Sequence, residues 1–308
     1  MRYMQILAVL MLTASVSFAA EASRNFEKTF DASTLKKIRI ASSHGSVTVQ
    51  GKEDIESIRV RVYIRVKAND QATAVQMVGD MDVRMKVRRK TLHLTTIRPK
   101  ANISGWSGTR IRERLIRVDV EVPMRMVVEC RSSHGPIVAN DVKHMGINSS
   151  HGSIKVSNAG SVKVKSSHGS VTLSNISGIV DLKNDHGSTE GYRLENLAGS
   201  YGHGSVKLED QRGWVSLKGN HGSVKIEYRK AVKEMKLSVG HGSVTVDMPR
   251  NSDIKLRADV EFGSVLVRNL KHIEDTKSSG TTRLIIGSGP VDVDLKTRHG
   301  SVRINGER

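Results

Sequence analysis

The sequence predicts an all-β protein, a right-handed parallel β-solenoid of short two-strand rungs with a small N-terminal strand/helix insertion. The first observation is a phrase, His-Gly-Ser-Val, which recurs with small variations from residue 44 to residue 302. The second is its period: from His134, the intervals to the next His-Gly pair are 17, 17, 18, 17, 18 and 20 residues. A nearly fixed period of this size is typical of stacked repeats, in which each unit packs on its neighbours.

Two strands fit each period. The half-repeat Gly-x-Val-x-Val, in which Ile or Leu can replace Val, starts at Gly152, Gly160, Gly169 and Gly178. Its apolar residues alternate with Lys, Thr or Asp, so each strand has one apolar face. A hairpin meander is the alternative, but self-similarity at a two-strand period favours a solenoid. Its rungs would lie about 4.8 Å apart, and its sheets would face each other across roughly 10 Å. Connections between parallel strands are right-handed, so we expect a right-handed solenoid. Only 4% of the residues are aromatic, which suits a thin core between the two sheets.

Residues 1–19 have the pattern of a secretory signal peptide. Arg2 supplies the charge, Ile6 to Val16 form the apolar run, and small residues end at Ala19. Cleavage after Ala20 or Ala22 fits nearly as well. The run is too short to span a bilayer, and no second run of spanning length follows. We therefore expect an exported protein, with the periplasm favoured over the cell surface or the medium.

Residues 20–123 form a β-rich segment with the first repeat copy and an insertion. The insertion predicts a long strand over Ile55 to Ala68, from strict alternation, and a helix over Asp70 to Met81. The expected buried face of that helix carries Ala74, Val75, Met77, Val78 and Met81. A hairpin-like strand pair (Val83 to Arg89 and Thr91 to Ile97) and a Gly- and Ser-rich loop around Trp106 follow.

Residues 124–308 form the solenoid repeat region. The pattern loosens after Tyr228, and Lys271 to Gly280 is a longer insertion. We expect the last alternating residues, from Val291 to Ile304, to form strands that cap the stack.

The charge points to anionic partners. The chain has a formal net charge of +18, which falls to +17 when Arg2 is removed with the signal peptide. Such a balance favours lipopolysaccharide, acidic envelope glycans or anionic lipid headgroups, and export makes nucleic acid the least favoured partner. From Asp82 to Arg131 the net charge is +8. The candidate polyanion contacts in this segment are Arg84, Arg88, Arg89, Arg110, Arg112, Arg114 and Arg117. The alternative interpretation is an ordinary solvated strand face.

The sequence gives little evidence for a catalytic site. Cys130 alternates in register with Met126 and Val128, so we expect a buried thiol. Carboxylates occur singly rather than in the clusters that glycan-cleaving enzymes need, and no Gly-x-Ser-x-Gly elbow is present. The sequence therefore predicts a protein that is not an enzyme.

The histidine that precedes each glycine is the main candidate for a functional site. Seven consecutive copies should stack on one edge over about 29 Å, and they are His134, His151, His168, His186, His203, His221 and His241. Neutral imidazoles on adjacent rungs could hold Zn, Cu or Ni, although the neighbours are mostly Ser and Gly, and Asp185 alone supplies a nearby carboxylate. The alternative is structural, since His tolerates unusual turn dihedrals and can stack on its copies.

These features together resemble the putative-adhesin domain family of bacterial exported β-strand-repeat proteins. The matching residues are Gly45-Ser46-Val47, Val120-Glu121-Val122-Pro123, the tandem Gly-x-Val-x-Val repeats and Val246-Asp247-Met248-Pro249. The resemblance covers about residues 30–308. It implies a right-handed β-solenoid-like fold and export, but no activity, because the function of the family is largely undefined. The near-fixed His departs from the family, whose members usually vary that residue.

The sequence thus leads to two functional hypotheses. The favoured one is an exported β-solenoid envelope protein that acts as a structural or adhesin-like interaction module and contacts an anionic surface or glycan. The alternative is a periplasmic metal-binding protein that uses a stacked histidine ladder, with Zn, Cu or Ni as the candidate cofactor.

Overall fold

A computed structural model describes residues 20–98, 111–271, 276–280, 282–286 and 288–307. The predicted signal peptide, the loop around Trp106 and Arg110 therefore lie outside the described residues. The N-terminal part contains β1 (Ala20–Asp31), β2 (Lys37–His44), β3 (Ser46–Lys52), β4 (Ser57–Ala68), α1 (Gln71–Asp80), β5 (Asp82–Arg88), β6 (Thr91–Ile97) and β7 (Ile111–Pro123).

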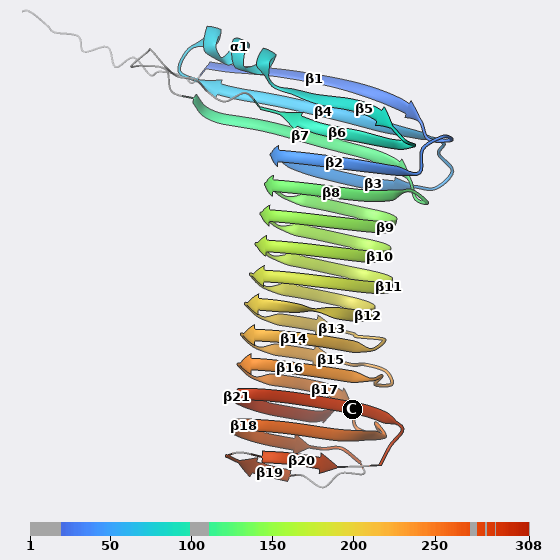
Figure 1. Cartoon of the computed structure of the whole chain (residues 1–308), viewed down its shortest axis with the longest axis vertical. Coiled ribbons are helices and arrows are strands. Elements are labelled where there is room, and N and C mark those ends of the chain that lie inside the picture. The colour runs from blue at the N-terminus through green and yellow to red at the C-terminus, as the bar shows by residue number, and fades with distance from the viewer. Residues whose placement is uncertain (1–19, 99–110, 272–275, 281, 287, 308) are drawn as a thin grey trace, which may run out of the picture.

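The repeat region follows, and Figure 1 shows it as a tall stack of rungs. Its strands are β8 (Val127–His134), β9 (Ile137–His151), β10 (Ile154–His168), β11 (Val171–His186), β12 (Thr189–His203), β13 (Val206–Glu209), β14 (Val215–His221), β15 (Val224–Glu227), β16 (Met235–His241), β17 (Val244–Pro249), β18 (Ile254–Arg268), β19 (Thr276–Ser279), β20 (Thr282–Ile286) and β21 (Val291–Glu307). The predicted right-handed parallel β-solenoid is confirmed.

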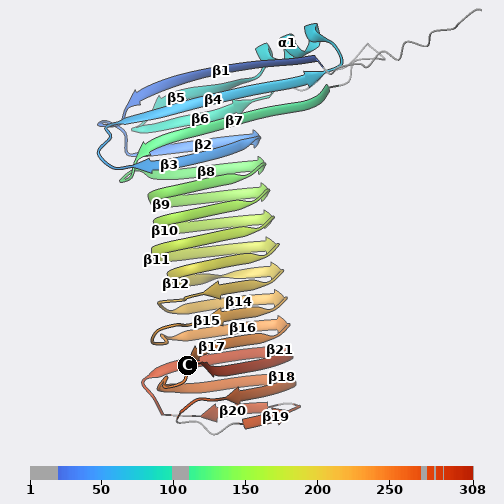
Figure 2. The same cartoon turned by 180° about the vertical axis from the view of Figure 1, so that it is seen from behind.

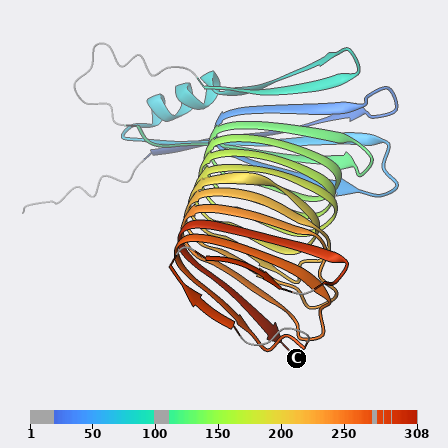
Figure 3. The same ribbon diagram turned by 60° about the horizontal axis from the view of Figure 1, so that its bottom comes forward.

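Each rung pairs in parallel with the next, at a register set by the repeat. In the β10–β11 pair, for example, Ile154 lies opposite Val171 and His168 opposite His186. The two predicted half-strands of a period join into one bent strand in β9 to β12, which have 15 or 16 residues each. Figure 3 shows the resulting two facing layers of strands along the stack. The Val, Ile and Leu residues of both layers form one buried core.

In β9, β10 and β11, the bend within the rung falls on a residue with positive φ. Asp141, Asn158 and Asn175 have φ of 57°, 52° and 53°, a region that Asn and Asp tolerate better than most residues. Their side chains also link the rungs: the Asn158 amide donates to the Asp141 carboxylate (2.9 Å), and the Asn175 amide donates to the Asn158 carbonyl (3.0 Å). This corner is therefore a short ladder of side-chain hydrogen bonds.

The opposite corner of each rung is made by the glycine of the repeated phrase. Gly152, Gly169 and Gly187 have φ between 121° and 130°, and a Cβ atom on Gly169 would lie 2.2 Å from the carbonyl oxygen of Gly152. The amide of Gly152 donates to the carbonyl of His168 in the next rung (3.2 Å). Both the backbone conformation and the close approach of the chain therefore require glycine.

A column of buried residues lies two positions before each histidine. It carries Ser on the first rungs, at Ser132, Ser149 and Ser166, and then changes to Asn184 and Tyr201. The Tyr201 hydroxyl donates to the Gly222 carbonyl (3.2 Å), and the Asn184 amide donates to the Gly187 carbonyl (3.0 Å). Asn184 and Tyr201 thus satisfy carbonyls of the glycine corner from inside the stack, whereas the buried hydroxyls of Ser132 and Ser166 have no hydrogen-bond partner among the described residues.

The N-terminal insertion closes one end of the stack. The first repeat copy is already inside it, because β2 lies between β6 and β8, and β3 lies between β7 and β9. Beyond this rung, β4 pairs antiparallel with both β1 and β7, and β5 forms the predicted hairpin with β6. Figure 2 shows β1, β4 to β7 and α1 at this end, which we call the N-terminal cap.

The helix forms as predicted, but its buried face is narrower. The Asp70 side chain caps it by accepting from the Thr73 amide (2.8 Å), and Ala74 and Val78 are buried. The inclusion of Val75 was wrong, since its side chain is 55% exposed. Within the described part of the chain, no helix combines the length and apolar character needed to cross a membrane.

The C-terminal strand does not cap the stack, so that prediction was wrong. β21 lies inside it and pairs in parallel with β16 and β17 on one side and with β18 on the other. The described strands that cover the outer side of β18 are instead β19 and β20, both antiparallel to it. The chain leaves a space of one rung after β17, and its last strand fills that space (Figure 1).

The glycine corner gives a first testable prediction. Gly169→Ala should lower the free energy of unfolding by about 2–5 kcal/mol, because it adds both a strained φ and an overlap with the Gly152 carbonyl. Gly79→Ala is the matched control: it lies in α1 with open space around its Cβ position, so it should stabilise by about 0.5–1 kcal/mol. Urea unfolding followed by circular dichroism measures both, and equal midpoints for the two variants would contradict the role of the corner.

The buried column gives a second prediction. A Cβ on Gly219 would lie 2.0 Å from the Tyr201 ring, so Gly219→Ser alone should destabilise the protein. In a Tyr201→Ser background the same change restores the Ser-on-Ser arrangement of the earlier rungs, and its cost should fall. We expect a coupling free energy of about 0.5–3 kcal/mol from a double-mutant cycle of urea unfolding. Additive effects would show that the two sites do not share space.

Candidate functional site

The histidines of the repeated phrase form one continuous stack of rings, which we call the histidine ladder. The order is His44, His134, His151, His168, His186, His203, His221, His241 and His299, with Phe262 beyond His299. Neighbouring ring centroids are 4.7–5.0 Å apart, and from His134 to His241 the ring planes differ by 2–5°. All nine histidines are exposed.

The ladder follows from the backbone of the corner. Each histidine directly precedes the glycine whose positive φ turns the chain, so its side chain lies on the outer edge between the two sheets. The parallel register then places each imidazole opposite the next, as for His151 and His168. The imidazole spacing therefore equals the rung spacing of the sheet.

The structure extends the predicted ladder at both ends. The seven consecutive histidines from His134 to His241 all lie in it, and His44 and His299 join it from distant parts of the sequence. Spacing alone did not reveal these two, because 90 and 58 residues separate them from their stacked neighbours. The shared His-Gly-Ser-Val phrase is the signal that could have found them.

The stacked geometry does not converge on a metal. Two metal–nitrogen bonds of about 2.1 Å reach about 4.2 Å, which is less than the ring separation of 4.7–5.0 Å. Nearly parallel ring planes also direct the in-plane lone pairs of neighbours along parallel lines. Among the described residues, no group of three or more His, Cys, Asp or Glu side chains could hold a metal ion. Binding of Zn, Cu or Ni by the ladder stays a prediction.

The N-terminal end of the ladder is strongly positive. Partial burial lowers the pKa of His44, and the nearby charges of Arg98, His134 and Arg114 lower it further. Burial, together with the charge of Arg114, also lowers the pKa of Arg98. Neither guanidinium has an acidic partner among the described residues. His44 therefore resists protonation unless an anion offsets the nearby positive charge.

The predicted basic residues do not all share one face. Arg84 and Arg88 alternate with the buried Val83 along β5, so they lie on its exposed face, and Arg89 lies in the hairpin turn with φ of 47°. On β7, Arg114 lies on the same side as the buried Ile116, whereas Arg117 lies on the opposite side. Arg112 is the extra residue at an irregularity in the pairing of β7 with β4. Arg112 donates to the Asn69 side chain (3.3 Å).

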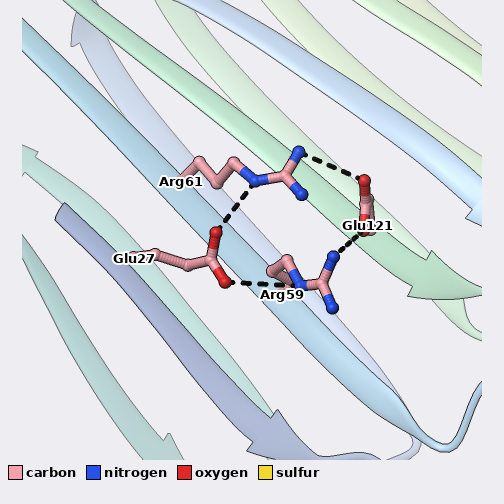
Figure 4. Close-up of polar contacts among 4 residues, drawn as sticks. All are labelled: Glu27, Arg59, Arg61 and Glu121. Carbon is pink, nitrogen blue, oxygen red and sulfur yellow. Dashed lines mark hydrogen bonds and ion pairs between the residues drawn. The ribbon is translucent and has the colours of Figure 1, made fainter. Parts of the chain in front are cut away.

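The outer face of β4 is neutralised, although it is rich in arginine. Figure 4 shows Arg59 and Arg61 between two carboxylates, Glu27 and Glu121. Arg61 lies 2.9 Å from Glu27 and 3.2 Å from Glu121, and Arg59 lies 3.4 Å and 3.3 Å from the same residues. Arg65 pairs with Glu113 (2.6 Å) in the same way. These guanidiniums therefore form ion pairs with carboxylates on neighbouring strands of the sheet.

The hairpin of β5 differs sharply from that face. None of Arg84, Lys86, Arg88, Arg89 and Lys90 has an acidic partner among the described residues, and all five are exposed. Beside them, Val87 is 53% exposed. The structure therefore divides the broad basic segment of the sequence into separate groups. One is formed by the five unpaired cations of this hairpin, and another by Arg98 and Arg114 beside His44.

The single cysteine is buried, as predicted. Cys130 is 2% exposed, and burial raises the pKa of its thiol to about 12. Such a thiol is almost entirely protonated at neutral pH and is therefore a poor nucleophile.

Comparisons with known proteins fit this architecture. A comparison with curated proteins finds no match. Among solved structures, a putative lipid binding protein from Parabacteroides distasonis is 14% identical, with 94% of this chain and 97% of that chain covered and a TM-score of 0.39. A putative adhesin from Bacteroides fragilis is 10% identical, with 91% and 97% covered and a TM-score of 0.37. A putative cell adhesion protein from Clostridium sporogenes is 13% identical, with 93% and 100% covered and a TM-score of 0.27.

At identities of 10–14% and TM-scores below 0.5, these likenesses carry no information about function. The family match is broader: the model described as Toastrack DUF4097 matches residues 35–305, which include the stack and the N-terminal cap except β1. It confirms the resemblance seen in the sequence, and the chain belongs to the Toastrack DUF4097 family.

Proposed function

We propose that this protein is an exported interaction module of the cell envelope, which contacts anionic surfaces through the hairpin of β5 and β6. The observation that carries the proposal is the set of unpaired cations on that hairpin. They are Arg84, Lys86, Arg88, Arg89 and Lys90, within seven residues of chain. Elsewhere on the cap, arginines such as Arg59 and Arg61 have carboxylate partners.

The position of the hairpin supports a contact role. It lies at the cap end of the stack, where nothing in the described chain covers its outer face (Figure 1). Cations on such a surface attract anionic lipid headgroups, each contributing about 1 kcal/mol near the membrane. The exposed side chain of Val87 adds apolar contact at the same place, as in interfacial segments that combine basic and apolar residues.

The proposal is binding rather than catalysis, in line with the scattered carboxylates and the buried thiol. Export rests on the predicted signal peptide, and we favour the periplasm. Both envelope sources of anionic groups, lipid headgroups and acidic glycans, would meet the same cations, so the test includes each of them.

The proposal predicts that Arg84→Glu, Arg88→Glu and Arg89→Glu together weaken binding to vesicles of anionic lipid at least about 100-fold, since three cations of about 1 kcal/mol each are lost and repulsion is added. Vesicle co-sedimentation at low and high salt measures this. Lipopolysaccharide and an acidic glycan serve as further probes, and neutral vesicles give the background.

The matched control carries the same change in charge elsewhere, with Lys230→Glu, Lys233→Glu and Lys271→Glu on exposed loop residues of the C-terminal half. It should retain most of the binding. Equal losses in both triple variants would mean that net charge alone, and not the hairpin, attracts the anionic surface. Circular dichroism confirms the fold of each variant.

A further inference from the structure

We propose that the histidine ladder is a second binding surface, which holds a flexible chain of phosphate groups along its length and takes up protons as it does so. The surface is separate from the β5 hairpin, and the proposal does not rest on the one above. It rests on the geometry of the exposed imidazoles, the cations beside them and the chemistry that the stack presents.

The ladder is a straight and open row of donors. Its nine exposed rings, spaced at 4.7–5.0 Å, form a line roughly 38 Å long. Each neutral imidazole carries one N–H donor, and each protonated one carries two. A linear ligand with a repeated anionic group can therefore contact successive rungs, and its affinity should grow with its length.

Stacking decides which part of each ring a ligand meets. Because every inner imidazole has a neighbour against both faces, only its edges are open to a partner. Nucleic acid bases bind single-stranded sites mainly by stacking on aromatic faces, and such faces are covered here except at the ends, beside Phe262 and His44. Ring edges with N–H donors fit oxyanions instead.

The ladder is flanked by free cations on both sides. Arg131, Lys165 and Lys218 each lie three residues before a ladder histidine, on the exposed face of one sheet. Lys155 and Arg303 lie four residues after one, on the exposed face of the other sheet. None of these five has an acidic partner among the described residues. A polyanion along the edge would therefore lie between three free cations on one sheet and two on the other.

Acidic groups near the ladder are few and mostly engaged. Asp185, beside His186, pairs with Lys183 (3.7 Å), and Glu261, beside Phe262, pairs with Arg298 (3.0 Å). Farther from the rings, Lys225 pairs with Asp247 (3.3 Å). Other charged groups on strands that flank the ladder include Lys207 with Glu209, Lys296 with Asp259 and Asp294, Lys163 with Asp181, Glu129 with Lys37 and Arg39, Glu190, and at the N-terminal end Arg98, Arg114, Arg117 and Asp119.

Protonation of the ladder is coupled to ligand binding. An isolated imidazole has a pKa of about 6.5, but charges one rung apart repel, so neighbouring rings resist joint protonation. Phosphate groups along the edge offset this repulsion and favour the charged rings. By linkage, a bound polyanion favours proton uptake by the ladder, and acidification raises the affinity for polyanion.

The test is titration calorimetry with inorganic polyphosphate, with tripolyphosphate as the short ligand, at pH 5.5 and 7.5 and in EDTA to exclude metals. We expect long polyphosphate to bind at least about 10-fold more tightly at pH 5.5, a difference of about 1.4 kcal/mol. It should also bind more tightly than tripolyphosphate at equal phosphate concentration. Calorimetry in two buffers of different ionisation enthalpy should show net proton uptake.

Variants locate the effect. His168→Gln, His186→Gln and His203→Gln together interrupt the middle of the ladder and should abolish most of the pH dependence. His144→Gln changes an exposed histidine outside it and should retain that dependence. The triple Glu variant of the β5 hairpin should retain it as well, which separates this proposal from the preceding one.

Three results would overturn the proposal: no proton uptake by the unmodified protein, the same pH dependence in the triple Gln variant, or tripolyphosphate binding as tightly as the long chain. If the triple variant is unfolded by circular dichroism, the single variant His186→Gln replaces it. Histidine NMR signals of the unmodified protein, followed during polyphosphate addition, then decide whether the ladder is the binding surface.

Discussion

Contact between glycine backbones at one corner controls the whole stack. A rung can lie on the one before it only if the chain turns in a conformation of positive φ, with its backbone against the carbonyl of the preceding glycine. No side chain fits at that point. The corner therefore fixes the rung spacing and the parallel register, and it repeats in every period because each rung meets the same steric condition. The Val, Ile and Leu core fills the space that the corners define.

Two other columns follow from this constraint. The residue two positions before the histidine faces inward, and at Tyr201 and Asn184 its side chain donates to a carbonyl of the corner. The histidine itself faces outward and inherits the spacing of the backbone, so its ring must stack on the next. The structural role of the ladder and its proposed binding role are thus compatible, since stacking leaves the N–H edges open.

Local patterns predicted the local structure well. The alternation of β4, the Asp70 cap of α1, the β5–β6 hairpin and the buried Cys130 all depend on neighbouring residues, so a single sequence carries the information. Val75 was misplaced because a helix on the edge of a cap buries a narrower face than the periodicity suggests.

The predictions that were wrong or missing concern contacts between residues far apart in the sequence. Nothing in the spacing shows that β21 lies next to β17, or that His44 stacks on His134 across an insertion of many residues. The candidate arginines were similarly grouped by sequence, but strand alternation separates Arg114 from Arg117. Outside that group, carboxylates from other strands neutralise Arg59 and Arg61. The charge of a segment indicates a binding surface for anions only once the cross-strand partners of its side chains are known.

The position of β21 separates the order of synthesis from the order of stacking. Residues 254–286 leave the ribosome before the rung that must lie between them and β17 exists, so β18 has no parallel partner until residues 291–307 follow. During that interval, β17 and β18 each have a strand edge without its parallel partner, which is able to pair with another chain. Loss of this last segment would therefore open the stack in its interior instead of shortening it from the end.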